Sequence, residues 1–411
     1  MTSIERSADR TRSGDGRSPN GATAARQSNL ERGRRSERRT RTLAIGALIS
    51  SAAVTGLAIV WLTTPESSPF ATTATATSLA DTLLDAAAAA LLALVVGVTG
   101  IALGTALTIR PDLARRLVVG SAAAVLALAF AFLFGSMSTI AIAGYLFGAL
   151  AVVAGPVTIL VLLWRAPRLG SALLVLLLAL LAVAFMWAGL TVDAVTGFAV
   201  NTGRALVAGS GVFSLVGLGL VSTLLWSAIA IIVLRSVGSG RFEAWLVRHR
   251  RSITLLAAAG PLPYLVARAS WLTPWPLFGP SSDDLDPATL ATGLVLGGGA
   301  AAACLLTLGL ILPWGRVFPR WMPRIGGRSV PVAVAAVPGF TAAGILCVAA
   351  VPMLMTTVGP ADSPADALLV NLVLPLWFWG PMLALAVSAY VAWRARDGVS
   401  SAARAGTRSA L

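Results

Sequence analysis

The sequence contains no lysine, a single histidine and only two cysteines. Charged residues make up 12% of its 411 residues, about half the share usual in soluble domains. The length alone would allow two or three soluble domains, but this scarcity of charge argues against them. Hydrophobic residues account for 57% of the chain and the mean hydropathy is +0.83. Most of the chain must therefore be buried in lipid or against other helices.

All of the basic charge is arginine, and the net charge is +14. So basic a chain could bind nucleic acid. Here, however, the arginines lie beside apolar runs, as membrane topology requires, so we expect no nucleic-acid partner. The absence of lysine, together with abundant alanine, is typical of a GC-rich bacterial genome.

Ten apolar runs are each close to or longer than the roughly 20 residues that cross a bilayer. They predict an all-α fold, a polytopic transmembrane helix bundle with ten spans. We place the spans at about residues 43–62, 83–108, 117–135, 138–164, 171–191, 212–234, 252–272, 290–312, 331–357 and 368–393.

The distribution of arginine predicts the orientation of these spans. With the N-terminus and the C-terminus both cytoplasmic, 29 of the 31 arginines lie on the cytoplasmic side, and only Arg204 and Arg268 lie on the outer side. We therefore expect a bacterial plasma membrane protein with three parts. Residues 1–42 form a disordered basic cytoplasmic tail, residues 43–393 the ten-helix transmembrane domain, and residues 394–411 a short cytoplasmic tail.

The segment 313–331 differs from the apolar runs on either side of it. Its proline residues exclude one regular helix and favour turns and extended pieces. Arginine side chains beside tryptophan rings suit anionic lipid head groups or another phosphate-bearing partner. The alternative is an ordinary cytoplasmic loop, in which arginine only sets topology. The candidate head-group contacts are Trp314, Arg316, Arg320, Trp321, Arg324 and Arg328.

Arg268 is the candidate ligand-binding residue within the spans. It lies about 6 Å below the predicted outer boundary of the seventh span. One hypothesis places it facing inward, paired with Asp85 or Asp193 and available to an anionic ligand, with Pro261 and Pro263 opening the helix below it. The alternative is that its long side chain reaches outward to the interface.

Signals for catalysis are weak. The only histidine, His249, shares one face of a short interfacial helix with Phe242, Trp245 and Leu246. No carboxylate lies in the middle of a span, and no nucleophile, nucleotide-binding or zinc motif is present. We therefore expect a non-enzymatic protein without a cofactor or metal.

The acidic cluster at 283–286 and the two cysteines each allow a specific hypothesis. The cluster either holds a divalent ion in an outward-facing lipid-linked transferase or caps the next helix. Cys304 and Cys347 differ in predicted depth by roughly 12 Å, so we expect them to remain unbonded.

Three segments resemble multi-pass membrane proteins of actinobacteria whose function is uncharacterised. They are residues 264–271 (YLVARASW), 314–331 and 376–382 (LWFWGPM). The resemblance covers roughly the last 150 residues and implies a bacterial plasma membrane protein without specifying a ligand. Our first hypothesis is transport or binding of a small amphipathic or anionic molecule. The second is a scaffold for cell-envelope or division machinery, with a membrane-protein partner.

Overall fold

The computed structural model describes residues 19–70, 78–136, 138–186, 189–237, 240–278, 286–322, 324–358 and 364–408. Within these ranges the chain forms α-helices and short 3-10 turns, and the only β-type pairing is two isolated bridges. The prediction of an all-α fold is therefore confirmed.

Most of the long α-helices follow the predicted apolar runs. In chain order they are α1 (Pro19–Thr63), α2 (Leu79–Leu83), α3 (Ala86–Ile109), α4 (Leu117–Phe134), α5 (Ser138–Arg165), α6 (Pro167–Met186), α7 (Val192–Ala208), α8 (Ser210–Val237), α9 (Gly240–Arg248), α10 (Arg250–Ala259), α11 (Leu262–Ser270), α12 (Pro287–Leu308), α13 (Val332–Val358), α14 (Pro364–Val373) and α15 (Leu376–Arg408).

Nine segments of the described chain are long and apolar enough to cross a membrane. They lie on α1, α3, α4, α6, α8, α10 with α11, α12, α13, and α14 with α15. The remaining predicted span, the fourth at 138–164, coincides with α5, a helix of 28 residues, of which Val153–Arg165 is a shorter apolar segment among the described residues. These apolar helices suggest a membrane-embedded protein, and the count of ten remains a prediction.

Both ends of the bundle are more helical than the sequence predicted. Helix α1 begins at Pro19, so the part of the basic tail from residue 19 to 42 is helical rather than disordered. Helix α15 likewise continues past residue 394 to Arg408. Neither extension contains an internal proline, and arginine, alanine and glutamate have high helix propensity. A helix nucleated in the apolar run therefore propagates into the tail.

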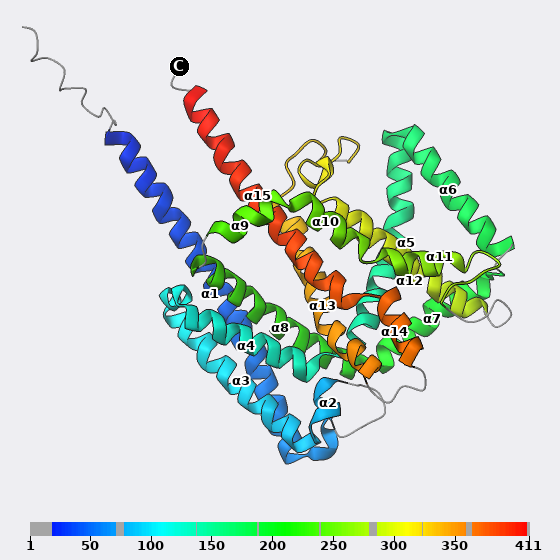
Figure 1. Ribbon diagram of the computed structural model, residues 1–411, viewed down its shortest axis with the longest axis horizontal. Coiled ribbons are helices and arrows are strands. Elements are labelled where there is room, and N and C mark those ends of the chain that lie inside the picture. The colour runs from blue at the N-terminus through cyan, green and yellow to red at the C-terminus, as the bar shows by residue number, and fades with distance from the viewer. Residues whose placement is uncertain are drawn as a thin grey trace, which may run out of the picture.

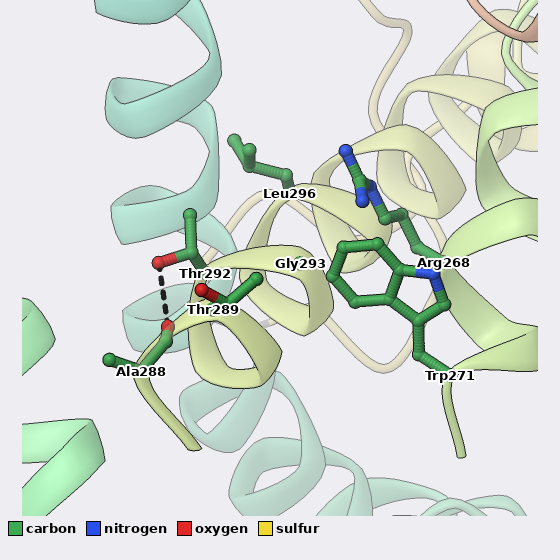
Figure 2. A pocket seen from close by; sticks show the side chains of 7 residues that line it. All are labelled: Arg268, Trp271, Ala288, Thr289, Thr292, Gly293 and Leu296. Carbon is green, nitrogen blue, oxygen red and sulfur yellow. Dashed lines mark hydrogen bonds between the residues drawn. The ribbon is translucent and has the colours of Figure 1, made fainter. Parts of the chain in front are cut away.

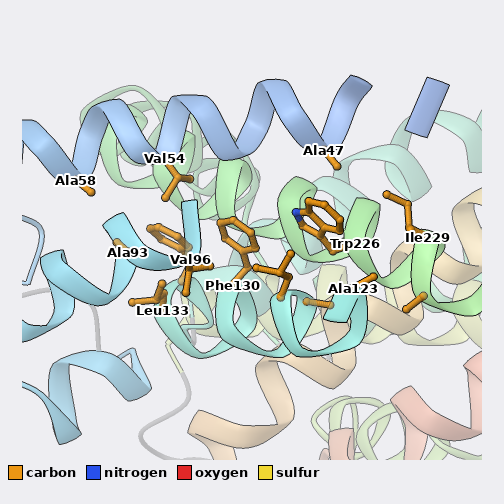
Figure 3. Packing of buried hydrophobic residues seen from close by; sticks show 14 of the residues in the cluster. Ala47, Val54, Ala58, Ala93, Val96, Ala123, Phe130, Leu133, Trp226 and Ile229 are labelled. Carbon is orange, nitrogen blue, oxygen red and sulfur yellow. The ribbon is translucent and has the colours of Figure 1, made fainter. Parts of the chain in front are cut away.

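Helices α1, α3, α4 and α8 pack together around the largest apolar core (Figures 1 and 3). Trp226 of α8 is fully buried at its centre and donates a hydrogen bond of 3.3 Å from its indole nitrogen to the hydroxyl of Ser51 on α1. Phe130 and Phe134 of α4 stack on each other in the same core. This hydrogen bond satisfies the one polar atom of the buried indole.

A second core joins α9, α10, α13 and α15. The span formed by α10 and α11 is interrupted at Gly260 and Pro261, as the proline pattern predicted. Proline lacks the backbone donor that the helix ladder needs, which explains the interruption. The ring of Trp379 on α15 lies against Gly260, so the neighbouring helix covers the interruption.

A third, smaller core forms where α11 packs against α12, which also contacts α5 and α7. Trp271, at the end of α11, is buried in this core. This contact between α11 and α12 positions Arg268, the candidate ligand-binding residue.

Candidate functional site

Arg268 lies on α11 between two aromatic side chains of the same helix. Its guanidinium carbon is 4.1 Å from the centroid of the Trp271 ring and 4.8 Å from the centroid of the Tyr264 ring. The spacing of these residues, four and then three positions apart, places them on one helical face. Cation–π contacts of this kind hold an arginine side chain in a defined position.

A cavity of about 270 Å³ opens beside this arginine (Figure 2). From α11, Arg268 and Trp271 line it. From α12, its lining residues are Ala288, Thr289, Thr292, Gly293 and Leu296. The volume is slightly below the range usual for drug-sized ligands, which begins near 300 Å³, so the cavity suits a small molecule or a small part of a larger one.

Two glycines of α12 make the close approach of α11 possible. A Cβ atom at Gly293 would overlap the ring of Trp271, and one at Gly297 would lie 2.9 Å from Cβ of Arg268. These residues form a GxxxG pair, a spacing of small residues that permits close helix packing. The pair therefore serves packing inside the bundle and seats the two principal side chains of the cavity.

The cavity offers one cationic group and two hydroxyl oxygens. The Nε atom of Arg268 is buried and has no hydrogen-bond partner among the described residues. Thr289 donates its hydroxyl proton to Asp286 at 2.6 Å, and Thr292 donates to the carbonyl of Ala288 at 2.9 Å. Each threonine oxygen still has lone pairs that can accept a hydrogen bond. Chemically, the cavity matches an anionic group next to an apolar or weakly polar part.

Asp286 occupies the N-cap of α12, at the edge of this cavity. Its carboxylate accepts hydrogen bonds from the backbone nitrogens of Ala288 and Thr289 as well as from the Thr289 hydroxyl. These bonds, that of the Thr289 hydroxyl first, lower the pKa of Asp286 below its ordinary value. Of the two hypotheses for the acidic cluster, the helix-capping one fits Asp286. Asp283 and Asp284 lie outside the described residues.

The structure does not bring Asp85 to Arg268. Asp85 caps α3, accepting a hydrogen bond of 2.7 Å from the backbone of Ala88, and α3 packs against α1, α2 and α4. Asp193 lies in the first turn of α7, a helix that contacts α12. Within the described ranges, neither carboxylate forms an ion pair with Arg268. The positive charge of Arg268 therefore has no carboxylate partner in this part of the chain.

The second predicted site, residues 313–331, forms a folded loop that we call the Arg loop. Its two ends pair as a short hairpin, in which the backbone N–H of Phe318 donates to the carbonyl of Arg328 at 2.9 Å and Val317 bridges Ser329. Arg324 and Gly327 adopt positive φ angles of 62° and 79° at the turn. The predicted combination of turns and extended pieces is confirmed for the described residues of the loop. Pro323 lies outside them.

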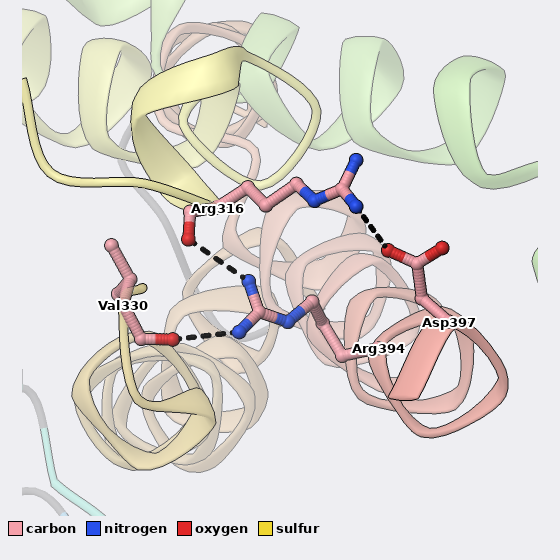
Figure 4. Close-up of polar contacts among 4 residues, drawn as sticks. All are labelled: Arg316, Val330, Arg394 and Asp397. Atoms are coloured by element: carbon pink, nitrogen blue, oxygen red, sulfur yellow. Dashed lines mark hydrogen bonds and ion pairs between the residues drawn. The ribbon is translucent and has the colours of Figure 1, made fainter. Parts of the chain in front are cut away.

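Side chains of α15 hold the base of the Arg loop (Figure 4). Arg394 donates hydrogen bonds to the carbonyls of Arg316, at 3.3 Å, and Val330, at 2.7 Å, and so bridges the two ends of the loop. Arg316 forms an ion pair with Asp397 at 2.9 Å. The hydroxyl of Tyr390, one turn earlier on α15, donates to the carbonyl of Gly315 at 2.8 Å.

The four arginines of the Arg loop therefore differ in role. Arg316 is committed to Asp397 and also faces the ring of Trp393 at 5.8 Å. Arg320, Arg324 and Arg328 are exposed, and their side chains form no ion pair among the described residues. The two candidate tryptophans, Trp314 and Trp321, also lie on the loop. Trp321 is half-buried, whereas the ring of Trp314 packs over Gly309 at the end of α12 and is 37% exposed.

His249 directly follows the short helix α9, on which the sequence predicted its aromatic neighbours. Its ring centroid is 5.0 Å from that of Trp245, which in turn stacks on Phe242. Leu246 on the same helix is fully buried against the second core.

Cys304 and Cys347 are free thiols, and Cys347 packs against Gly380. No cluster of metal-ligating side chains occurs among the described residues.

Sequence reasoning missed both the α12 wall of the cavity and the contacts that hold the Arg loop. The spacing of Thr289, Thr292 and Leu296 on one helical face is a signal that could have indicated the wall. Tyr390, Arg394 and Asp397 likewise recur at positions i, i+4 and i+7 of a helix. Their partners are backbone carbonyls and one arginine about 75 residues earlier in the chain, and no local pattern indicates such contacts.

No family model matches the sequence, and neither the curated proteins nor the solved structures include a match to it.

Proposed function

We propose that the chain is an integral protein of the bacterial plasma membrane that binds, and in the course of transport releases, a small amphipathic molecule with an anionic group. The proposal includes ten spans with both termini in the cytoplasm. The N-terminal part of α1 and the C-terminal part of α15 extend from the same end of the bundle, which supports that orientation (Figure 1). The arginine distribution supports it independently.

One observation carries the proposed ligand. Arg268 stacks on Trp271 at the wall of a cavity, and its buried Nε atom has no hydrogen-bond partner in the described part of the chain. A buried hydrogen-bond donor without an acceptor is costly, so an incoming anion that accepts a hydrogen bond from this Nε–H group gains binding free energy from it. The Trp271 ring and Leu296 provide apolar contact for the rest of the molecule.

The test is to extract the full chain together with its surrounding lipid and identify the bound small molecules by mass spectrometry. We expect a molecule with a carboxylate, sulfate or phosphate group and an apolar part, and we expect its recovery to fall in Arg268→Gln. Recovery of only bulk lipids, in the same proportions from both proteins, would contradict the proposed binding site.

The resemblance to uncharacterised actinobacterial membrane proteins enters the proposal only as support for the cellular location. A second function, a scaffold for envelope or division machinery, is favoured by the folded Arg loop held on α15. A loop that only sets topology needs no such fixed shape. A membrane-protein partner that is lost when the Arg394 contacts are removed would favour the scaffold over the transporter.

A further inference from the structure

We propose that the tip of the Arg loop, defined by Arg320, Arg324 and Arg328 with Ile325, docks on the anionic lipid head groups of the same bilayer. This inference is independent of the Arg268 cavity, because the two sites lie on different segments and share no residue. It concerns how the protein sits in its membrane and which lipids surround it.

The first argument is that the positive charge of the Arg loop is not balanced by acidic residues within the loop. The segment 313–331 contains four arginines and no aspartate or glutamate. Among the four, Arg316 alone pairs with a carboxylate of the described residues, that of Asp397 on α15. The three tip arginines point their charge to the surface and form no ion pair among the described residues. Each basic side chain near an anionic membrane surface adds to its attraction, so three on one short loop form a strong site.

The second argument is that the loop is folded before any partner arrives. The Phe318–Arg328 pairing closes the hairpin, and Arg394 ties its two ends together through two backbone carbonyls. Holding the backbone in place reduces the conformational entropy lost on binding. Arginine forks that are already positioned can each make two parallel hydrogen bonds to phosphate oxygens, which a lysine ammonium cannot.

The third argument identifies the partner as a membrane surface. Apolar side chains are exposed on the loop between the arginines: Val317 is 42% exposed and Ile325 39% exposed. Exposed apolar side chains interleaved with arginines are typical of segments that lie at the boundary between head groups and acyl chains. The loop also connects two apolar helices directly, since α12 ends at Leu308 and α13 begins at Val332. Lipid head groups are therefore the nearest anionic groups outside the protein.

The experiment compares lipid selectivity in variants that lose equal charge at different places. The full chain is reconstituted in bilayers of phosphatidylcholine with a minor share of phosphatidylglycerol, and the phosphatidylglycerol retained by the protein is measured by native mass spectrometry. The test variant carries Arg320→Gln, Arg324→Gln and Arg328→Gln. The matched control carries Arg110→Gln, Arg165→Gln and Arg168→Gln, three exposed arginines elsewhere on the predicted cytoplasmic side.

We expect the tip variant to bind phosphatidylglycerol at least about tenfold more weakly than the wild type. The affinity of the control variant for phosphatidylglycerol should differ from that of the wild type by less than about twofold. Lysine at the three tip positions should weaken binding severalfold, since charge is kept and fork geometry is lost. The tip arginines are exposed and form no ion pair with any described residue, so these variants should fold normally, which circular dichroism and gel filtration check.

Four results would overturn the proposal. These are a wild type without preference for phosphatidylglycerol, an equal loss in the tip variant and the control, full binding by the lysine variant, and displacement of the lipid by inorganic phosphate. The last would identify a soluble phosphate compound as the ligand. Arg394→Gln tests the folded shape separately. Arg394→Gln should reduce the selectivity for phosphatidylglycerol more than Arg168→Gln, which removes the same charge. Equal effects of the two variants would contradict the role of the Arg394 hydrogen bonds in holding the loop.

Discussion

The guanidinium of Arg268 lies 4.1 Å from the centre of the Trp271 ring, and both side chains are seated on glycines of the neighbouring helix α12. Arg268 is thus held against aromatic rings of the protein, with its Nε atom buried. An arginine that only reaches outward for the interface needs neither contact. The arrangement makes the α11–α12 contact the part of the molecule where packing and the proposed binding are linked.

Replacement of Gly293 tests that link. In Gly293→Ala the added methyl group overlaps the Trp271 ring, which is buried and cannot easily move away. We expect a loss of about 1–3 kcal/mol in the free energy of unfolding. Gly298→Ala is the matched control, because nothing lies within 4 Å of a Cβ atom there and alanine favours the helix. Denaturation of both variants in SDS titrations measures the difference. Equal stability would show that α11 and α12 do not pack as described.

The largest core makes an independent prediction. Trp226 is fully buried and hydrogen-bonded to Ser51, whereas Trp164 on α5 is 90% exposed. Trp226→Ala should lower the free energy of unfolding by about 3–5 kcal/mol, because a large cavity opens between α1, α3 and α8. Trp164→Ala should cost far less. A small effect at Trp226 would mean that these helices are arranged differently.

Asp286 predicts a dependence of stability on pH. Because hydrogen bonds lower its pKa below 3.8 in the folded protein, its contribution is present above pH 3.8 and is lost as the pH falls through the folded value. At neutral pH, Asp286→Asn should therefore be less stable than the wild type, and the difference should shrink in acid. Asp112→Asn, which removes an exposed carboxylate elsewhere, is the control. Thermal unfolding at neutral pH and at a pH below the folded pKa of Asp286 measures the stability difference between Asp286→Asn and the wild type. A difference that grows on acidification would contradict the prediction.

Topology is tested by reporter fusions. Reporters placed after Arg41, within residues 316–328 and after Arg394 should all report the cytoplasm, because these positions follow the arginine-rich segments. A reporter near Asp284 should report the outer side. A cytoplasmic signal near Asp284 would rule out the ten-span arrangement with both ends inside.

Hydropathy predicted most of the fold because long apolar runs permit few structures other than membrane helices. The break of the seventh span at Gly260 and Pro261 also followed from local chemistry, since proline removes a backbone donor. Helix α7 was missed and assigned to an outer segment. Its residues 192–208 mix apolar positions with Asp193, Asn201 and Arg204, so no long apolar run marks it.

The candidate sites were less predictable, because they depend on contacts distant in sequence. The position of Arg268 in its span indicated an unusual charge, but the cavity arises from which helix packs on α11. Similarly, the sequence indicated all four arginines of the Arg loop as candidate head-group contacts. The structure separates Arg316 from the other three only because Asp397 of α15 lies within reach of it.

Anion-dependent stabilisation at Arg268 tests the central claim most directly. Hexanoate is the probe, hexanamide its neutral counterpart, and thermal unfolding of the full chain the measurement, because a ligand that binds the folded state raises its unfolding temperature. Arg204→Gln removes an exposed arginine of α7 and serves as the control. The account predicts that hexanoate stabilises the wild type and Arg204→Gln more than hexanamide does, and that Arg268→Gln loses this difference while reaching the membrane in normal amount. Equal stabilisation of Arg268→Gln and the wild type by hexanoate, or no effect of hexanoate on the wild type, would contradict it.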